Sequence, residues 1–293
     1  MQQYQDSMAP EWFIKAVNTP YTDKYIDVEG SKIHYQHWSN TGEKQGLLLV
    51  HGGGAHSHWW DFIAPSFLER FDIAAIDISG MGDSEHREKY SLDQFAKELI
   101  SVCADAGFGN DTIIAAHSFG GLGTLQAALN YPDRLKGIVV VDSAIFPPEF
   151  KGTNDMKGNP FKSKKVYPDI ESGLGRFRLV PPQTCENDYI LRFIARTSIG
   201  EVEGGWSWKF DMEFLQKTEM SDLSDRVRDI KVKTSVVYGE KSMLFMPAMM
   251  DFMKSVYHED VPFIMLPDAQ HHLFLDKPLE FIDLMKETLQ AYQ

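Results

Sequence analysis

The sequence predicts an α/β fold with a mostly parallel central sheet that is flanked by helices. Two observations carry this prediction: short apolar runs recur along the chain, and helix-like amphipathic segments separate them. Short runs that are apolar throughout are typical of strands buried on both faces, and their alternation with helices makes parallel βαβ units. A third observation is that the alternation stops after residue 146 and resumes near residue 234, which predicts an inserted segment.

The predicted elements follow in order along the chain. An N-terminal extension, residues 1–23, contains an amphipathic run at 9–17 that is expected to pack on the insertion or on another subunit. Two alternating strands joined by a Gly-Ser turn are predicted at 24–28 and 32–38. Buried strands are predicted at 47–50, 73–76, 112–115, 138–141, 234–238 and 263–266. Helices are predicted at 57–70, 92–106 and 122–131.

The inserted segment divides the chain into a core and a cap. Residues 147–222 are rich in Pro, Gly and Asn and then amphipathic, without a convincing buried strand, so a mostly helical cap is expected there. The core then comprises residues 1–146 and 223–293. Open α/β sheets bind their ligands beyond the carboxyl ends of their strands, so a site is expected at that edge of the core.

Composition excludes several classes of protein. The 293 residues carry a net charge of −13, which disfavours nucleic-acid binding, and no apolar run approaches the roughly 18 residues of a membrane span. Because the first residues lack a basic flank followed by an apolar stretch, a cytoplasmic location is expected. Cys103 and Cys185 lack metal-site spacing and are predicted to be reduced thiols. No metal is predicted, since His56 and His58 have no carboxylate cluster at ligand spacing.

A single serine stands between a predicted strand and a predicted helix. In the run "AAHSFGGLG", Ser118 follows the apolar residues 112–116 and precedes three glycines. Small residues on both sides allow a tight, strained turn, and the helix that follows would point its positive end at anything bound to the serine. The position therefore predicts that Ser118 lies at the ligand-binding edge of the sheet, where a reaction would take place.

These motifs resemble the α/β-hydrolase fold family. The pentapeptide Ala-His-Ser-Phe-Gly matches the family's Gly-x-Ser-x-Gly turn with Ala in place of the first Gly, and "HGGG" at 51–54 matches its oxyanion loop. "DISGMGDS" at 77–84 is similar to a structural loop of the family, and "DAQHHLFLDKP" at 268–278 is similar to its histidine loop. The resemblance implies Ser118 as nucleophile, His271 rather than His272 as base, and the backbone N–H groups of Gly53 and Phe119 as oxyanion-hole donors.

The acid of the triad has two candidates. Many family members carry an Asp three residues after a Gly at the end of the strand that here ends near Tyr238, but this chain has Ser242 at that place. The preceding strand ends in Asp142, and a carboxylate at a strand end can reach the imidazole Nδ1. Asp142 is therefore the preferred acid, and Glu240 is the alternative.

The resemblance implies a serine hydrolase that needs no cofactor, with residues 147–222 as a cap over Ser118. The expected substrate is a small to medium, largely apolar carboxylic ester, because few charges are expected in the pocket. Trp206, Trp208 and Met243 are the candidate substrate contacts. Lactone hydrolysis, carbon–carbon bond hydrolysis and perhydrolysis with the same triad are alternatives, and a non-catalytic ligand-binding member of the fold is a remote one. A small-molecule ester is thus the expected partner, and a homodimer is an arrangement that the N-terminal run would allow.

Overall fold

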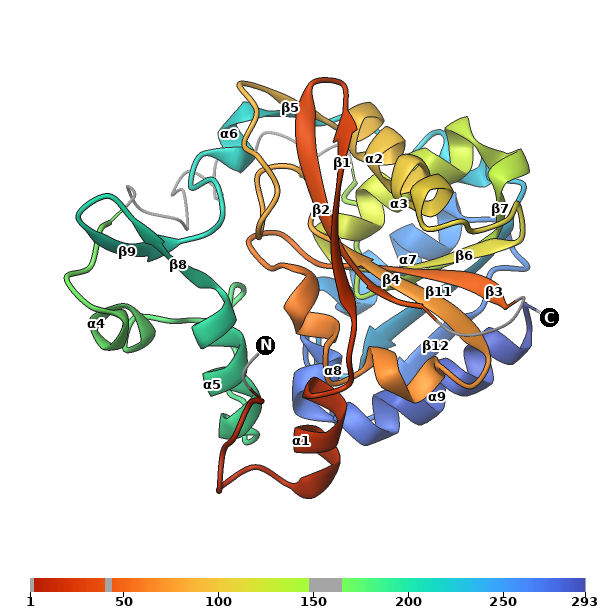
Figure 1. The fold of residues 1–293 in the computed structure, drawn as a ribbon. Coiled ribbons are helices and arrows are strands. Elements are labelled where there is room, and N and C mark those ends of the chain that lie inside the picture. The colour runs from red at the N-terminus through yellow and green to blue at the C-terminus, as the bar shows by residue number, and fades with distance from the viewer. Residues whose placement is uncertain (1–2, 40–43, 148–164, 293) are drawn as a thin grey trace.

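The computed structural model describes residues 3–39, 44–147 and 165–292. Its main sheet has eight strands in the order β1-β2-β4-β3-β6-β7-β11-β12 (Figure 1). The strand β2 runs antiparallel to β1 and β4, and the remaining neighbours are parallel. The strands are β1 (Thr22–Val28), β2 (Ser31–Trp38), β3 (Gln45–Val50), β4 (Phe71–Ile76), β6 (Thr112–His117), β7 (Leu135–Val141), β11 (Lys233–Gly239) and β12 (Phe263–Leu266). The predicted fold class is confirmed.

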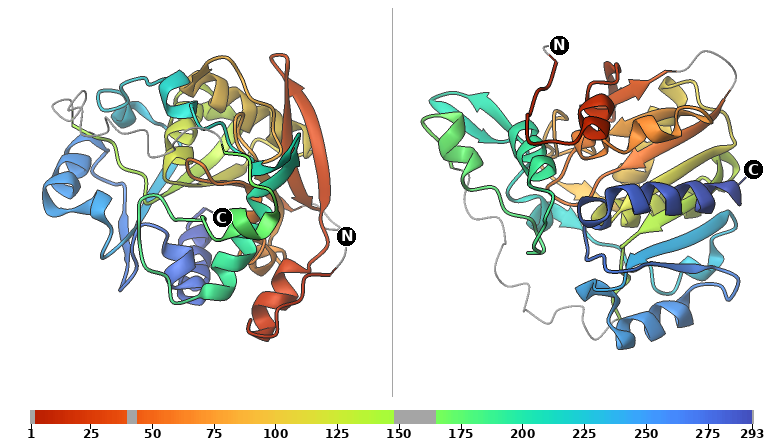
Figure 2. Two further views of the ribbon diagram at one scale, coloured as in Figure 1. Left: turned by 90° about the vertical axis from the view of Figure 1, so that its left-hand side faces the viewer. Right: turned by 90° about the horizontal axis from the view of Figure 1, so that it is seen from below.

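Each face of the sheet is covered by its own hydrophobic core. In β3 the side chains of Leu48 and Val50 enter one core and those of Leu47 and Leu49 enter the other, because successive strand residues point to opposite faces. The first core contains side chains of α2 (Leu92–Asp105), α3 (Phe119–Asn130) and α7 (Pro247–Val256). The second contains side chains of α1 (Glu11–Val17), α8 (Leu273–Asp276) and α9 (Pro278–Gln290); Figure 2 shows α9 along its face of the sheet.

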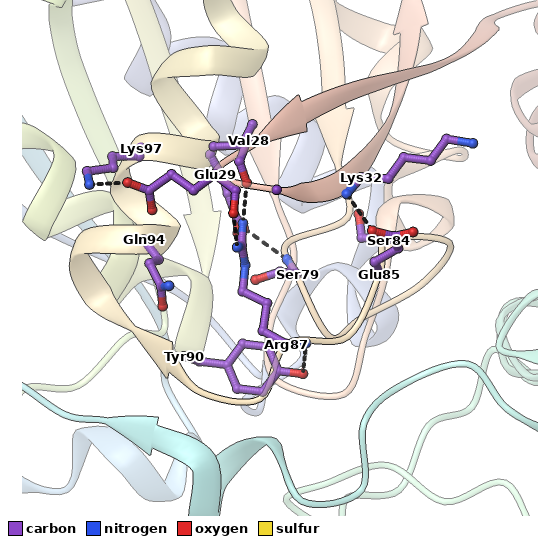
Figure 3. Close-up of polar contacts among 12 residues, drawn as sticks. Val28, Glu29, Lys32, Ser79, Ser84, Glu85, Arg87, Tyr90, Gln94 and Lys97 are labelled. Carbon is purple, nitrogen blue, oxygen red and sulfur yellow. Dashed lines mark hydrogen bonds and ion pairs between the residues drawn. The ribbon is translucent and has the colours of Figure 1, made fainter.

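A buried ion pair ties the β1–β2 hairpin to α2. The guanidinium of Arg87 lies 2.9 Å from Glu98 Oε1 and donates to the carbonyl oxygen of Val28 at 2.7 Å (Figure 3). The second oxygen, Glu98 Oε2, accepts the backbone N–H of Ser79 at 2.9 Å. Burial raises the pKa of Glu98 even though Arg87 and Ser79 oppose that shift. The cluster therefore joins three segments that lie far apart in the sequence.

The prediction of one helix at 57–70 is wrong. The segment instead forms two short 3-10 helices, η1 (Ser57–Trp60) and η2 (Ala64–Phe67). Pro65 has no N–H to continue a helix and disfavours helical geometry at the residue before it. The aromatic side chains of this segment are nevertheless buried in the second core.

The insertion contains strands as well as helices. Its described elements are α4 (Ile170–Leu174), α5 (Asp188–Thr197), β8 (Ile199–Val202), β9 (Gly205–Trp208), α6 (Phe214–Lys217) and β10 (Thr218–Glu219). The antiparallel β8–β9 hairpin was not expected. The strand β10 pairs in parallel with the short β5 (Tyr90–Ser91) of the core. In Figure 1, α4, α5 and the hairpin stand to one side of the main sheet. Residues 148–164 of the predicted cap lie outside the described residues.

The N-terminal helix packs on the insertion, the first of its two expected positions. The ring of Phe13 in α1 contacts the rings of Tyr189 and Phe193 in α5, with centroid distances of 4.9 and 5.7 Å. No helix in the described part of the chain is both long and apolar enough to cross a bilayer.

Candidate active site

Ser118 occupies a strained turn between β6 and α3. Its backbone has φ 50° and ψ −123°, a conformation that a residue with a Cβ rarely adopts and that costs about 1–3 kcal/mol. Hydrogen bonds hold it there: Ser118 N–H donates to Val141 O at 2.9 Å, and Ser143 Oγ donates to Ser118 O at 2.6 Å. The side chain is thereby held at the carboxyl edge of the sheet, where the sequence predicts it.

Two glycines allow this turn to pack against its neighbours. A Cβ at Gly120 would lie 2.3 Å from the carbonyl oxygen of His51, and a Cβ at Gly121 would lie 2.2 Å from Ser143 Oγ. Contacts this short do not occur between real atoms, so neither position accepts a side chain without a shift of the backbone or of Ser143. The glycine string after Ser118 is thus explained by close approach.

The structure brings His271 and Asp142 together. His271 Nδ1 lies 2.7 Å from Asp142 Oδ1, and both side chains are buried. Since an ionised carboxylate only accepts hydrogen bonds, Nδ1 carries the proton and Nε2 presents a lone pair. Asp142 Oδ2 also accepts the backbone N–H of Gly239 at 2.9 Å, and Oδ1 accepts the hydroxyl of Ser242 at 2.6 Å. Three donors therefore hold the carboxylate in one orientation.

Glu240 lies elsewhere. Its side chain is at the surface, where its carboxylate accepts the backbone N–H of Asp268 at 2.8 Å. No hydrogen bond joins Glu240 to His271 among the residues that the structure describes. Ser242 stands where many family members have the acid, but its hydroxyl donates a hydrogen bond to Asp142.

The loop after β3 lies beside the serine turn. A Cβ at Gly53 would be 3.4 Å from the Cβ of Phe119 and 3.0 Å from the ring of Phe214 in α6, so these three residues are neighbours. Within the described chain, the backbone N–H groups of Gly53 and Phe119 donate no hydrogen bond. Two unused donors thus flank the position of Ser118.

Three further histidines surround the site. His51 accepts the backbone N–H of Ile78 at its Nε2 and donates from Nδ1 to Gly52 O. His117 Nε2 donates to the backbone oxygen of His271 at 3.0 Å, and His272 Nδ1 donates to Gln183 Oε1 at 2.8 Å. Burial, reinforced by the neighbouring His271, holds the pKa of His117 and of His272 well below the usual range. Both rings are therefore neutral, and they pack around the loop that carries His271.

Ser118 and His271 line one cavity of about 640 Å³. Trp208 lines it too, whereas Trp206 and Met243 do not; the side chain of Met243 is 69% exposed outside it. Sequence reasoning missed the aromatic lining residues Trp59 and Phe177. It also expected few charges, but the cationic residues Lys165, Arg176 and Arg178 line the cavity, and no acidic residue of the described chain does. Their spacing in the sequence gave no signal of this grouping.

The loop "DISGMGDS" at 77–84 contains a network of hydrogen bonds and ion pairs around Asp77. Asp77 accepts His34 Nδ1 at 2.7 Å and the backbone N–H groups of Ser57 and Asp83. Burial alone would lower the pKa of His34, but hydrogen bonds with Asp23 and Asp77 outweigh it and raise the pKa to about 9. Among the described residues, His34, Asp77 and Asp83 also have ligand atoms within 4.8 Å of one another. These ligand atoms already form hydrogen bonds or ion pairs with other protein groups, so we interpret the network as structural rather than as a metal site.

The fold and this site define a hydrolase of the α/β class, and comparison with known proteins gives its family. The family model described as alpha/beta hydrolase fold matches residues 46–278, which is most of the chain. The chain therefore belongs to the alpha/beta hydrolase fold family and is a hydrolase of the esterase type.

Individual relatives are distant but nearly full-length. A 2-(acetamidomethylene)succinate hydrolase of Mesorhizobium japonicum is 24% identical over 237 residues, 78% of this chain and 81% of that protein. A pimeloyl-(acyl-carrier protein) methyl ester esterase of Aeromonas hydrophila is 24% identical over 259 residues, 84% and 95% of the two chains. The crystal structure of E-2-(acetamidomethylene)succinate hydrolase is similar with a TM-score of 0.77 at 21% identity, covering 93% of this chain and all of that one. That likeness concerns the fold.

Proposed function

We propose that the protein is a serine hydrolase that cleaves carboxylic esters through an acyl-enzyme intermediate. The observation that carries the proposal is the shared cavity: Ser118, on its strained turn, and His271, whose Nδ1 lies 2.7 Å from Asp142 Oδ1, line the same space. A nucleophile, a base and a group that orients the base are the parts that this chemistry requires.

Each residue has one role in the reaction. Ser118 Oγ attacks the acyl carbonyl carbon while His271 Nε2 takes the hydroxyl proton. Asp142 holds the tautomer with the proton on Nδ1 and stabilises the imidazolium that forms. The N–H groups of Gly53 and Phe119 donate to the developing oxyanion. His271 then protonates the leaving alcohol, and a water molecule that it deprotonates releases the acid from Ser118.

The substrate class is an ester of small to medium size. A cavity of about 640 Å³ with Trp59, Phe177 and Trp208 in its lining suits a partly apolar ester. Residues 147–222 then serve as a cap that contributes part of this lining. The relative named as a methyl ester esterase supports a carboxylic ester as the substrate class.

Hydrolysis of p-nitrophenyl esters from acetate to laurate tests the proposal. The wild type is expected to hydrolyse the shorter esters and to be labelled by a fluorophosphonate, whereas Ser118→Ala loses both properties. Ser172→Ala is the control, because it removes another hydroxyl that lines the cavity and should keep the labelling. A folded wild type that cleaves no ester and resists the label would refute the proposed function.

A further inference from the structure

The cavity that holds Ser118 has an uneven charge. Among its lining residues, Lys165, Arg176 and Arg178 are cationic and none is acidic. The whole chain has the opposite balance, with 42 acidic and 29 basic residues. A lining that holds only cations in an acidic protein is therefore a local feature that composition does not explain.

In the part of the chain that the structure describes, these cations form no ion pair with a carboxylate. Elsewhere in the insertion, basic side chains form ion pairs, as Lys209 does with Asp83 and Lys217 with Asp211. Within the described residues no carboxylate pairs with Lys165, Arg176 or Arg178. Arg178 Nη1 donates to the carbonyl oxygens of Gly175 and Phe177, which orients the guanidinium but leaves its charge uncompensated.

The two arginines are next to an aromatic residue in the chain. Arg176 and Arg178 flank Phe177 in the chain, and the ring of Phe177 lies 6.1 Å from that of Trp208, centroid to centroid. All four residues line the cavity with Ser118. An apolar surface beside two unpaired guanidinium groups fits a molecule with an apolar stretch and an anionic group, since a guanidinium binds a carboxylate or phosphate through two parallel hydrogen bonds.

We propose that the cavity selects esters that carry an anionic group, a carboxylate or a phosphate, on the acyl or the alcohol part. Arg176 and Arg178 bind this group, and Lys165 adds to the attraction. The proposal rests on the proposed ester hydrolysis at Ser118 and names the substrate class of that site. The arginines are binding residues, so their loss changes KM for the anionic ester more than kcat.

Two matched pairs of esters test this selectivity. In the first pair, p-nitrophenyl hydrogen adipate carries an anionic acyl part and p-nitrophenyl methyl adipate is its neutral match. In the second pair, 4-acetoxybenzoate carries an anionic leaving group and its methyl ester is the neutral match. The quantity measured is the ratio of kcat/KM for the anionic ester to that for the neutral ester, at low and at high salt.

Substitution of the arginines should lower this ratio in at least one pair. An exposed ion pair corresponds to roughly a threefold effect, so Arg178→Gln is expected to lower the ratio about threefold and the double variant Arg176→Gln/Arg178→Gln about tenfold. The wild-type ratio should fall as salt screens the charges. Arg196→Gln is the matched control, because Arg196 is an exposed arginine of α5 that does not line the cavity. Competition by adipate or by inorganic phosphate distinguishes carboxylate from phosphate recognition.

The outcomes separate this inference from the proposed function. If the neutral esters are cleaved but the double variant keeps the wild-type ratio in both pairs, the inference is wrong and the proposed function stands. If no ester is cleaved, the proposed function fails, and calorimetric titration of Ser118→Ala with monomethyl adipate decides the inference. Binding that the double variant loses would support an anion site, and absence of binding would overturn it.

Discussion

Asp142→Asn tests the assignment of the triad acid most directly. The carboxylate accepts three hydrogen bonds, from His271, Ser242 and Gly239. An Asn amide can replace only one of the two oxygens as an acceptor. The backbone N–H of Gly239 cannot become an acceptor, whereas the Ser242 hydroxyl can rotate. The amide oxygen is therefore expected to face Gly239, and the amide NH₂ to face His271.

That orientation gives His271 the wrong tautomer. With an NH₂ group opposite it, Nδ1 becomes the acceptor and the proton moves to Nε2, the atom that should take the proton of Ser118. Loss of the correct tautomer lowers kcat by about 10⁴, which corresponds to about 5 kcal/mol of transition-state stabilisation. Burst-phase and steady-state hydrolysis of p-nitrophenyl butyrate would measure this loss, with circular dichroism to verify that the variant is folded.

Two control variants bracket the result. Glu240→Gln should keep kcat within about twofold, because this exposed carboxylate accepts a hydrogen bond from Asp268 and none from His271 among the described residues. Ser242→Ala should lower kcat by roughly tenfold, since one charge-assisted hydrogen bond to Asp142 contributes about 1.5 kcal/mol. If Asp142→Asn keeps its kcat within tenfold while Glu240→Gln loses several orders of magnitude, the assignment of the acid is wrong.

Three further substitutions test the structure around the site. Gly120→Ala places a Cβ 2.3 Å from His51 O and should destabilise the fold by about 3 kcal/mol or more in urea unfolding. His34→Gln removes a group whose pKa is raised to about 9. The stabilisation that this group provides is therefore complete below pH 6.5 and disappears as the pH rises through 9. The difference in free energy of unfolding between wild type and variant should shrink by roughly 3 kcal/mol over that range. Arg87→Met leaves the buried Glu98 carboxylate without its partner and should cost about 3–5 kcal/mol.

Each of these three has a matched control. Gly107→Ala introduces a Cβ at a positive φ with open space around it, so only backbone strain of about 1 kcal/mol is expected. His86→Gln changes an exposed histidine and should leave the pH dependence of unfolding unaltered. Lys97→Met removes an exposed ion pair with Glu29, which solvent screens, and should leave the free energy of unfolding nearly unchanged. Equal losses in a variant and its control would contradict the reason given for that variant.

The sheet could be predicted from the sequence because its strands are short, apolar throughout and separated by helices. The two 3-10 helices at 57–70 could not, because the apolar residues of this segment recur at helical spacing and Pro65 is the residue that breaks the pattern. In the insertion, the turn at Gly204 and Gly205 with alternating tryptophans is a hairpin signal, but the alternation was interpreted as a pocket wall. Of these two tryptophans, Trp208 lines the cavity and Trp206 does not; the backbone of Trp206 exchanges two hydrogen bonds with Tyr167.

The residues around Ser118 could be named from motifs, but their surroundings could not. The motifs specify local turns, and the turn of Ser118 follows directly from the small residues beside it. The cationic lining by Arg176 and Arg178 depends on how the insertion lies over the core, which no local pattern encodes. The catalytic roles of Ser118, Asp142 and His271 stay predictions that the substitutions above test.

Asp142 directly follows β7 rather than β11, and the geometry of neighbouring parallel strands makes either place possible for this carboxylate. Val141 pairs with Val237, so the carboxyl ends of β7 and β11 lie side by side, about 4.8 Å apart. A carboxylate after either strand can therefore reach a histidine on the loop that follows β12. Here Asp142 N–H donates to Val237 O and Gly239 N–H donates back to the Asp142 carboxylate, so β11 orients an acid that β7 carries. Ser242 Oγ lies 2.6 Å from Asp142 Oδ1. An Asp at position 242 would therefore place two like charges side by side. An acid introduced at position 242 should consequently raise kcat only in a variant that has lost the charge of Asp142.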